Sequence, residues 1–151
     1  MSEPSSWPLS EEALRVKVPK HMVTELKAST LSSDLFPTAI GYYPKAKSHK
    51  MNRIEHDDFI ICYCADGRGT LNTPYYHGEV ERGDLFILPP GTTHYYEADS
   101  RTPWSLFWCH YRGSLANAFY DHINIEAQSL VIHKLTSLNL LARFNDLVEN
   151  A

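Results

Sequence analysis

The sequence reads Gly83-Asp84-Leu85-Phe86-Ile87-Leu88-Pro89-Pro90-Gly91-Thr92-Thr93-His94, and this stretch decides the fold. Gly83 permits a tight turn before a short apolar strand. Pro89 and Gly91 then end that strand and reverse the chain, because proline cannot continue a hydrogen-bonded ladder and glycine accepts turn angles that other residues avoid. His94 begins the next strand. The stretch therefore predicts two short strands joined by a tight reversal, with an imidazole where the second strand starts.

The segments on both sides of this stretch have the same character. Short runs of strand-forming residues alternate with turns that contain Gly, Pro or Asp. A hairpin is expected over residues 75–81, with its turn at His77-Gly78. The other strands are expected at 39–43, 58–65, 70–73, 85–88, 94–98 and 104–111. So many short strands at close spacing predict a mainly β sandwich or barrel.

The chain divides into three parts around this region. Residues 1–35 show no sustained period and are interpreted as an N-terminal arm, with a disordered terminus as the alternative. Within it, Ser10-Glu11-Glu12-Ala13-Leu14 has the capping serine and the acidic residues that start a short helix. Residues 36–113 are expected to form the barrel. Residues 114–151 form a C-terminal helical segment, with helices at 114–122 and 138–148 and a brief strand at 130–132.

Composition narrows the range of functions. The 151 residues carry a formal net charge of −4 and lack the clustered Lys and Arg that bind nucleic acid. No apolar run approaches the ~20 residues of a membrane span, and the polar first residues differ from a secretory signal. An odd number of cysteines, three, is typical of reduced thiols in the cytoplasm. We expect a cytoplasmic domain that by itself binds neither nucleic acid nor a membrane.

The spacing Gly83-(x5)-Pro89-x-Gly91-(x2)-His94 resembles the second motif of the cupin superfamily. In cupins that bind metal, this histidine is one of four ligands, and an earlier His-x-His followed by Glu supplies the others. Here His56 and Asp58 stand in that region, and Cys62 stands where the Glu would be. A Zn or Fe site is chemically conceivable, but Cys62 lies in an apolar strand with Cys64 on the same face, which favours two buried core thiols. We expect no metal and no cofactor.

Four longer segments resemble the sensor domain of AraC-type transcription regulators. They are Gly41-Tyr42-Tyr43-Pro44-Lys45-Ala46, residues 60–69, residues 83–96 and residues 103–113. The resemblance implies a cupin or double-stranded β-helix (jelly-roll) barrel followed by C-terminal helices. It also implies a small-molecule effector, usually a sugar or related metabolite, and a homodimer formed through the helices. DNA is bound in such regulators by a C-terminal domain with two helix-turn-helix motifs, which this chain does not contain.

The resemblance also implies a set of ligand-binding residues. Arg53 lies where a member that responds to arabinose has an arginine for sugar hydroxyls, Tyr96 and Trp108 match pocket aromatics, and Leu106 replaces a pocket histidine. Strand alternation adds neighbours on the same faces. The predicted ligand-binding residues are Arg53, His94, Tyr96, Trp104, Trp108 and His110. Packed core is the alternative interpretation of these positions, and Trp7-Pro8 is a candidate lid.

Three functions follow, in order of preference. The first is an effector-binding regulatory domain that is not an enzyme and has no catalytic residue. The second is a stand-alone metal-dependent cupin enzyme, an isomerase or dioxygenase, with His94, His56, Asp58 and Cys62 as ligands. The third is a degenerate cupin that serves only for protein contacts.

Overall fold

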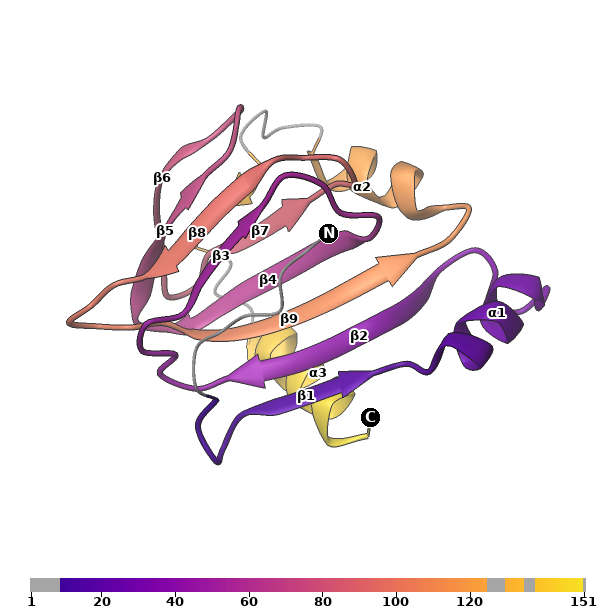
Figure 1. Cartoon of the computed structure of the whole chain (residues 1–151), viewed down its shortest axis with the longest axis horizontal. Helices are drawn as coiled ribbons and strands as arrows, with labels where there is room; N and C mark the ends of the chain where they lie inside the picture. Colours follow the sequence, from indigo (N-terminus) through magenta and orange to yellow (C-terminus); the bar gives the residue numbers. More distant parts are fainter. Residues whose placement is uncertain (1–8, 125–129, 135–137, 151) are drawn as a thin grey trace.

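The computed structural model describes residues 9–124, 130–134 and 138–150. Two sheets face each other, and helices lie at their outer side and ends (Figure 1). In chain order the elements are β1 (Leu14–Lys17), α1 (Lys20–Ala28), β2 (Phe36–Tyr43), β3 (Lys50–Arg53), β4 (Phe59–Asp66), β5 (Arg68–Asn72), β6 (His77–Glu81), β7 (Leu85–Leu88), β8 (His94–Ala98), β9 (Ser105–Arg112), α2 (Ala116–Asn124), β10 (Val131–Ile132) and α3 (Leu138–Glu149).

The strand order defines a jelly roll. One sheet runs β1-β2-β9-β4-β7-β10 and the other runs β3-β8-β5-β6, with antiparallel pairing throughout the named strands. Without the added outer strands β1 and β10, the eight strands from β2 to β9 are shared four and four between the sheets. This is the double-sheet arrangement of cupins. The predicted fold class, a mainly β jelly-roll barrel followed by helices, is confirmed.

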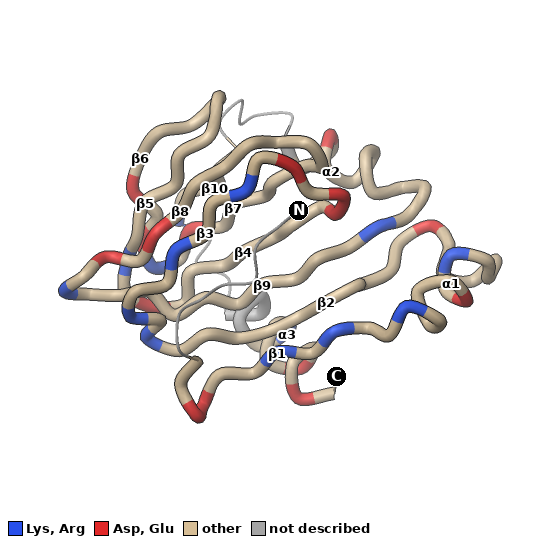
Figure 2. Tube along the Cα trace, viewed as in Figure 1, with Lys and Arg blue, Asp and Glu red and all other residues tan. Residues whose placement is uncertain are grey.

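The core lies between the two sheets because alternate residues of each strand face opposite sides. On β4, Ile60, Cys62 and Cys64 point into this interior, where each is at most 1% exposed. Both thiols are free cysteines, as the core interpretation of this pair predicts. Charged residues are sparse along the central strands and gather in loops and outer segments (Figure 2).

The outer face of the larger sheet is covered by α3. Phe144 of this helix stacks on Tyr63 of β4 and on Phe107 of β9, with ring centroids 5.9 Å and 5.7 Å apart. The helix thus buries the apolar residues that β4 and β9 turn away from the barrel interior. Among the described residues, no helix is long and apolar enough to cross a membrane.

A buried carboxylate fastens the segment between α2 and α3 to the barrel. Asp84, which is 1% exposed, accepts hydrogen bonds from the backbone N–H groups of Glu81 (2.9 Å) and Lys134 (3.0 Å). Its other neighbour is His133, whose Nδ1 lies 3.2 Å from Oδ2. Beside this contact, β10 pairs with β7. Asp84 therefore ties the approach to α3 to the turn before β7.

Two local expectations are wrong. Residues 10–14 do not start a helix: a turn closes with the Ala13 N–H donating to the Ser10 carbonyl (3.0 Å), and Leu14 then enters β1 against β2. The unpaired edge of β2 outweighs the local helix signal, because an open strand edge offers a row of hydrogen-bonding groups. The β5–β6 turn is at residues 73–76 rather than at Gly78, which pairs with Leu71. Thr73 stabilises this turn, since its Oγ1 accepts the backbone N–H groups of the next two tyrosines.

Candidate functional site

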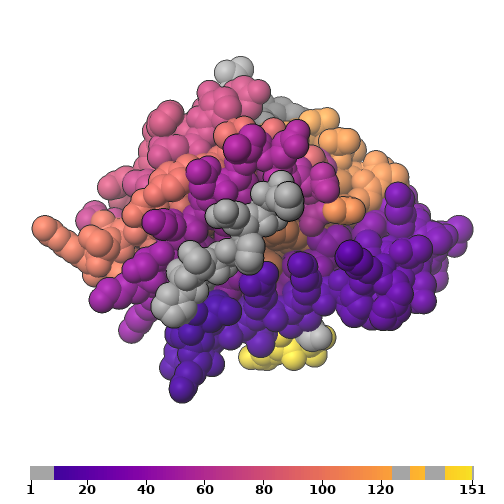
Figure 3. All heavy atoms as spheres, in the orientation of Figure 1, coloured from indigo at the N-terminus to yellow at the C-terminus, as the bar shows by residue number. Residues whose placement is uncertain are grey.

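Polar and aromatic side chains converge inside one end of the barrel. Arg53 at the end of β3 stands directly opposite His94 at the start of β8, and Met51 stands opposite Tyr96. The facing sheet contributes Trp108 and His110, whose rings lie 5.4 Å apart. The structure thus brings together five of the six predicted ligand-binding residues at one end of the interior. In the space-filling view the indigo N-terminal elements and the purple segment that includes β3 border this face of the molecule (Figure 3).

His94 presents a hydrogen-bond acceptor to the interior. It is 1% exposed, and its Nδ1 lies 2.9 Å from the carbonyl oxygen of Thr92. A carbonyl only accepts, so Nδ1 carries the hydrogen and Nε2 carries a lone pair. Burial lowers the pKa of His94 to about 4, which keeps the ring neutral near pH 7. Among the described residues, Nε2 has no hydrogen-bond partner.

His56 adds a second imidazole next to His94. Its ring meets that of His94 edge to face, with centroids 4.9 Å apart, and its Nδ1 lies 2.7 Å from the carbonyl oxygen of Asp58. Burial lowers the pKa of His56 as well. The sequence singled out this residue only as a metal ligand, because its loop gives no periodic signal that would place it in the interior.

Asp58 is an anion with its own partners. It accepts hydrogen bonds from Thr38 Oγ1 (2.7 Å) and Arg112 Nε, and His110 Nδ1 lies 3.5 Å away. Burial favours protonation of this carboxyl, but the bonds from His110, Arg112 and Thr38 outweigh burial and hold its pKa well below the ordinary value. The negative charge of Asp58 is therefore neutralised by its direct partner Arg112.

The positive charge of Arg53, by contrast, is not neutralised by an ion pair with any described residue. The Nε atom of Arg53 is buried without a hydrogen-bond partner. The ion pairs between charged side chains of the described residues are Arg68–Asp99, Arg112–Asp58 and Lys134–Glu81, with His110 beside Asp58 and His133 beside Asp84, and none of these contacts includes Arg53. The site therefore holds one guanidinium without a counter-ion from the described chain.

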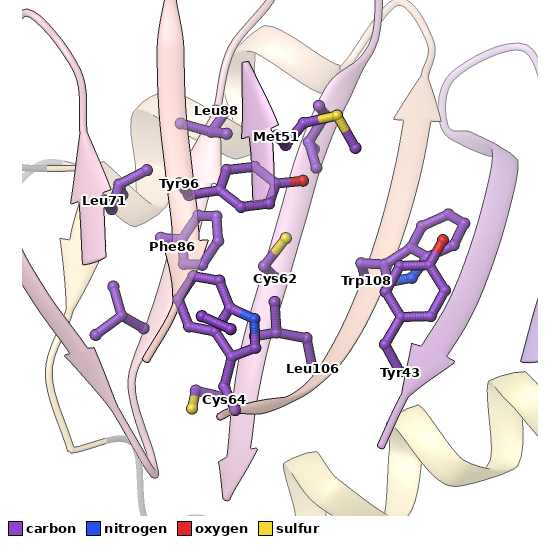
Figure 4. Packing of buried hydrophobic residues seen from close by; sticks show 14 of the residues in the cluster. Tyr43, Met51, Cys62, Cys64, Leu71, Phe86, Leu88, Tyr96, Leu106 and Trp108 are labelled. Atoms are coloured by element: carbon purple, nitrogen blue, oxygen red, sulfur yellow. The ribbon is translucent and has the colours of Figure 1, made fainter. Parts of the chain in front are cut away.

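Trp108 forms the aromatic wall opposite Tyr96. Its indole lies across Gly41 of β2, since a Cβ at that glycine would stand 2.4 Å from the indole Cζ2. The ring of Tyr43 packs beside it at 5.3 Å. Figure 4 shows this pair on one side and Tyr96 with Met51 on the other, with Cys62 between them. Sequence reasoning missed Gly41 and Tyr43, although a glycine inside an aromatic strand signals a close approach.

Trp104 lies apart from this group. It is fully buried, and its Nε1 donates to Nδ1 of His49 (3.1 Å). A Cβ on Gly69 would stand 2.2 Å from its ring, so the indole is packed tightly against β5. The only donor of this side chain is already bound, and the structure gives Trp104 the environment of a core residue.

The four candidate metal ligands are not gathered around one point. His56 and His94 are neighbours, but Asp58 is engaged by Arg112 and Thr38. Burial raises the pKa of the Cys62 thiol far above its ordinary value, which disfavours the thiolate that binds metal. Within the part of the chain that the structure describes, no group of three or more His, Cys, Asp or Glu is arranged to hold a metal ion.

An open groove of about 800 Å³ lies outside the barrel, away from this cluster. Tyr42 and Phe107 of the larger sheet form its floor, and residues 10–12 and Asn145 of α3 border it. Among the described residues, the buried His94 Nε2 and Arg53 Nε have no hydrogen-bond partner, and both lie in the interior, which is therefore the stronger candidate site.

Fold and site together define a cupin-like binding domain with a polar, aromatic interior. Residues 36–151 match the AraC-like ligand binding domain, and the chain belongs to this family. It is 43% identical over 122 residues to the MmsAB operon regulatory protein of Pseudomonas aeruginosa, a match that covers 77% of this chain and 39% of that protein. It is 39% identical over 62 residues to the raffinose operon transcriptional regulatory protein RafR of Pediococcus pentosaceus, covering 40% of this chain and 22% of that protein.

The chain therefore spans 39% or less of the length of these two relatives. Among solved structures it resembles the protein YhaK from Escherichia coli, with a TM-score of 0.53 and 10% identity, over 81% of this chain and 50% of that chain. At this identity the likeness concerns the fold alone.

Proposed function

We propose that this barrel binds a small-molecule effector, a sugar or related metabolite, and acts as the sensing domain of a transcription regulator rather than as an enzyme. Family membership supports an effector-binding regulatory role. Both relatives named above are operon regulators by name. In this proposal the remainder of a longer protein binds DNA in the cytoplasm, and effector binding shifts the population of its conformations.

One observation carries the proposal: polar atoms are buried in the interior without partners. Nε2 of His94 and Nε of Arg53 lack hydrogen bonds among the described residues. Leaving a buried polar group unpaired costs about 1–3 kcal/mol, so such groups in a jelly-roll core call for a ligand or water to satisfy them. The neighbouring Trp108 supplies an aromatic surface of the kind that packs against the apolar face of a sugar ring.

The test is ligand-dependent stabilisation of the domain. A panel of monosaccharides, disaccharides, sugar alcohols and uronic acids is screened by thermal unfolding. An effector at about 100 times its Kd stabilises the fold by about 2.7 kcal/mol. We expect Trp108→Ala and His94→Ala to abolish the shift, whereas Tyr75→Ala, at a side chain that is 68% exposed on the β5–β6 turn, leaves it unchanged. Hits that survive both interior substitutions contradict the proposed site.

A second candidate is a metal-dependent cupin enzyme, which the edge-to-face pair of His56 and His94 favours. Two imidazole nitrogens are half of a usual tetrahedral site. Elemental analysis distinguishes the two functions: near-stoichiometric Zn, Fe or Mn that is lost in His94→Ala supports the enzyme. Saturable effector binding that is unaffected by a chelator supports the sensor.

A homodimer through the C-terminal helices completes the proposal. Leu115 and Phe119 near and on α2 are 54% and 42% exposed, and Leu147 of α3 is 49% exposed. Sedimentation equilibrium with Phe119→Ser and Leu147→Ser measures whether these apolar side chains hold two copies together. An unchanged association constant in both variants contradicts this arrangement.

A further inference from the structure

The charge of the interior site is not balanced by the described chain. Arg53 brings a permanent positive charge, and the two carboxylates of the adjoining loop, Glu55 and Asp57, are exposed and form no ion pair with it. The one partly buried carboxylate at this end of the barrel, Asp58, is held by Arg112. Within the described residues the site therefore carries an excess positive charge.

The histidines around Arg53 do not change this balance near pH 7. Burial lowers the pKa of His94 to about 4, and it also lowers the pKa of His56 and His110. All three rings are therefore expected to be neutral there, which leaves the positive charge of Arg53 as the main local charge, with the exposed Arg15 of β1 adding a further positive charge that acts on His110. A neutral ring that carries its hydrogen on Nδ1 also keeps an acceptor at Nε2.

The geometry points to an effector that is a small hydroxylated carboxylic acid, such as a hydroxy acid or a sugar acid. This inference rests on the proposed function, because it names the chemical class that the interior site takes. Arg53 pairs with the carboxylate, which its planar fork can bind through two parallel N–H···O bonds. His94 accepts a hydrogen bond from a hydroxyl of the same molecule, which a carboxylate alone cannot give.

A neutral polyol suits this arrangement less well. Its hydroxyls would satisfy donors of Arg53, but the guanidinium would be shielded from water by the ligand with its charge uncompensated. A desolvated charge without a counter-ion is far more costly than a desolvated neutral donor. The rings of Trp108 and Tyr43 can pack against the carbon skeleton of an acid or of a neutral polyol, so they do not distinguish the two classes.

The experiment compares molecules that differ in the carboxylate. Galacturonate and galactose, gluconate and glucitol, glycerate and glycerol, and acetate and acetamide are titrated at constant ionic strength, and binding is measured by calorimetry and thermal shift. We expect at least one hydroxy acid to bind tenfold or more tightly than its neutral partner, a difference of 1.4 kcal/mol. Acetate at high concentration is expected to stabilise the protein more than acetamide does.

Arg53→Gln tests the assignment, and Arg68→Gln is the matched control. The control arginine is half exposed and pairs with Asp99, outside the interior site. The preference for the acid should vanish in Arg53→Gln and persist in Arg68→Gln. Without any ligand, Arg53→Gln should keep or raise the melting temperature, whereas Arg112→Gln should lower it because Asp58 loses its partner.

Three results overturn the inference. They are equal or tighter binding of the neutral partners, an acid preference that survives in Arg53→Gln, and absence of any carboxylate effect including that of acetate. If neutral sugars bind in a manner that depends on Trp108, the inference fails while the proposed function stands. If neither Arg53→Gln nor Trp108→Ala alters the binding of any compound, both fail.

Discussion

Replacing Asp84 by alanine should destabilise the domain more than its small loss of volume suggests. The carboxylate is 1% exposed and accepts two backbone hydrogen bonds, from Glu81 and Lys134, with His133 as a third neighbour. A hydrogen bond to a charged group contributes about 1.5–3 kcal/mol. Taking the lower figure for each, we expect a loss of about 3 kcal/mol in the free energy of unfolding.

Urea denaturation followed by circular dichroism measures this loss directly. A decrease of about 3 kcal/mol corresponds to about 10 °C in the melting temperature of a domain of this size. Asp99→Ala is the matched control, because Asp99 likewise accepts backbone hydrogen bonds, from Arg101 and Thr102, and one from the Thr102 hydroxyl, but in an exposed turn. Asp99→Ala should lower the free energy of unfolding by clearly less than Asp84→Ala does. A change below 1 kcal/mol for Asp84→Ala, or equal changes for both aspartates, would refute the reasoning from burial.

The remaining predictions concern the interior and its cover. Gly41→Ala should displace the indole of Trp108, cost about 1–3 kcal/mol by overpacking, and weaken effector binding, as tryptophan fluorescence and calorimetry can show. Asp58 has a lowered pKa in the fold, so its contribution is present above pH ~4 and is lost as the pH falls further; Asp58→Asn should flatten that acid limb in urea titrations at pH 2–7. His94, with its pKa lowered to about 4, should titrate below pH 5 in ¹⁵N spectra with its hydrogen on Nδ1, and because the unfolded imidazole binds its proton first, stability should fall between pH 6.5 and 4. Phe144→Ala should cost about 3–4 kcal/mol by removing the ring that covers β4 and β9, as chemical denaturation measures.

Much of the fold is predictable from local sequence because its strands are short and end at glycine or proline. The reversal at Pro89 and Gly91 and the strand that starts at His94 lie where the sequence places them. The alternation of β9 also predicts that Trp108 faces inward with Leu106. By contrast, β1 forms only because β2 leaves an open edge, and such a partner is invisible to a reading of residues 14–17 alone.

The sequence predicts most of the residues that lie together at this end of the interior, but not how their polar groups are paired. The family resemblance predicts Arg53 and strand alternation predicts His94, but their pairing across β3 and β8 depends on a register that spans about forty residues. Among the described residues, Arg53 has no counter-ion and His94 Nε2 has no hydrogen-bond donor, and such facts depend on the neighbours of a residue and not on the residue alone. Trp104 shows the opposite case, because the alternation that places it inside cannot reveal that His49 already takes its only donor.

One face of strand β9 lines the barrel interior, and its other face packs against α3. Trp108 faces the interior site, and its neighbour Phe107 stacks against Phe144 of α3. A single peptide bond separates Trp108, a residue of the proposed binding site, from Phe107, which contacts the helix. A substitution that moves the backbone of β9 at Trp108 is therefore expected to alter the contact between Phe107 and Phe144 of α3 as well. If the proposed site binds the effector, substitutions at Trp108 that change binding are therefore expected to change the packing of α3 as well.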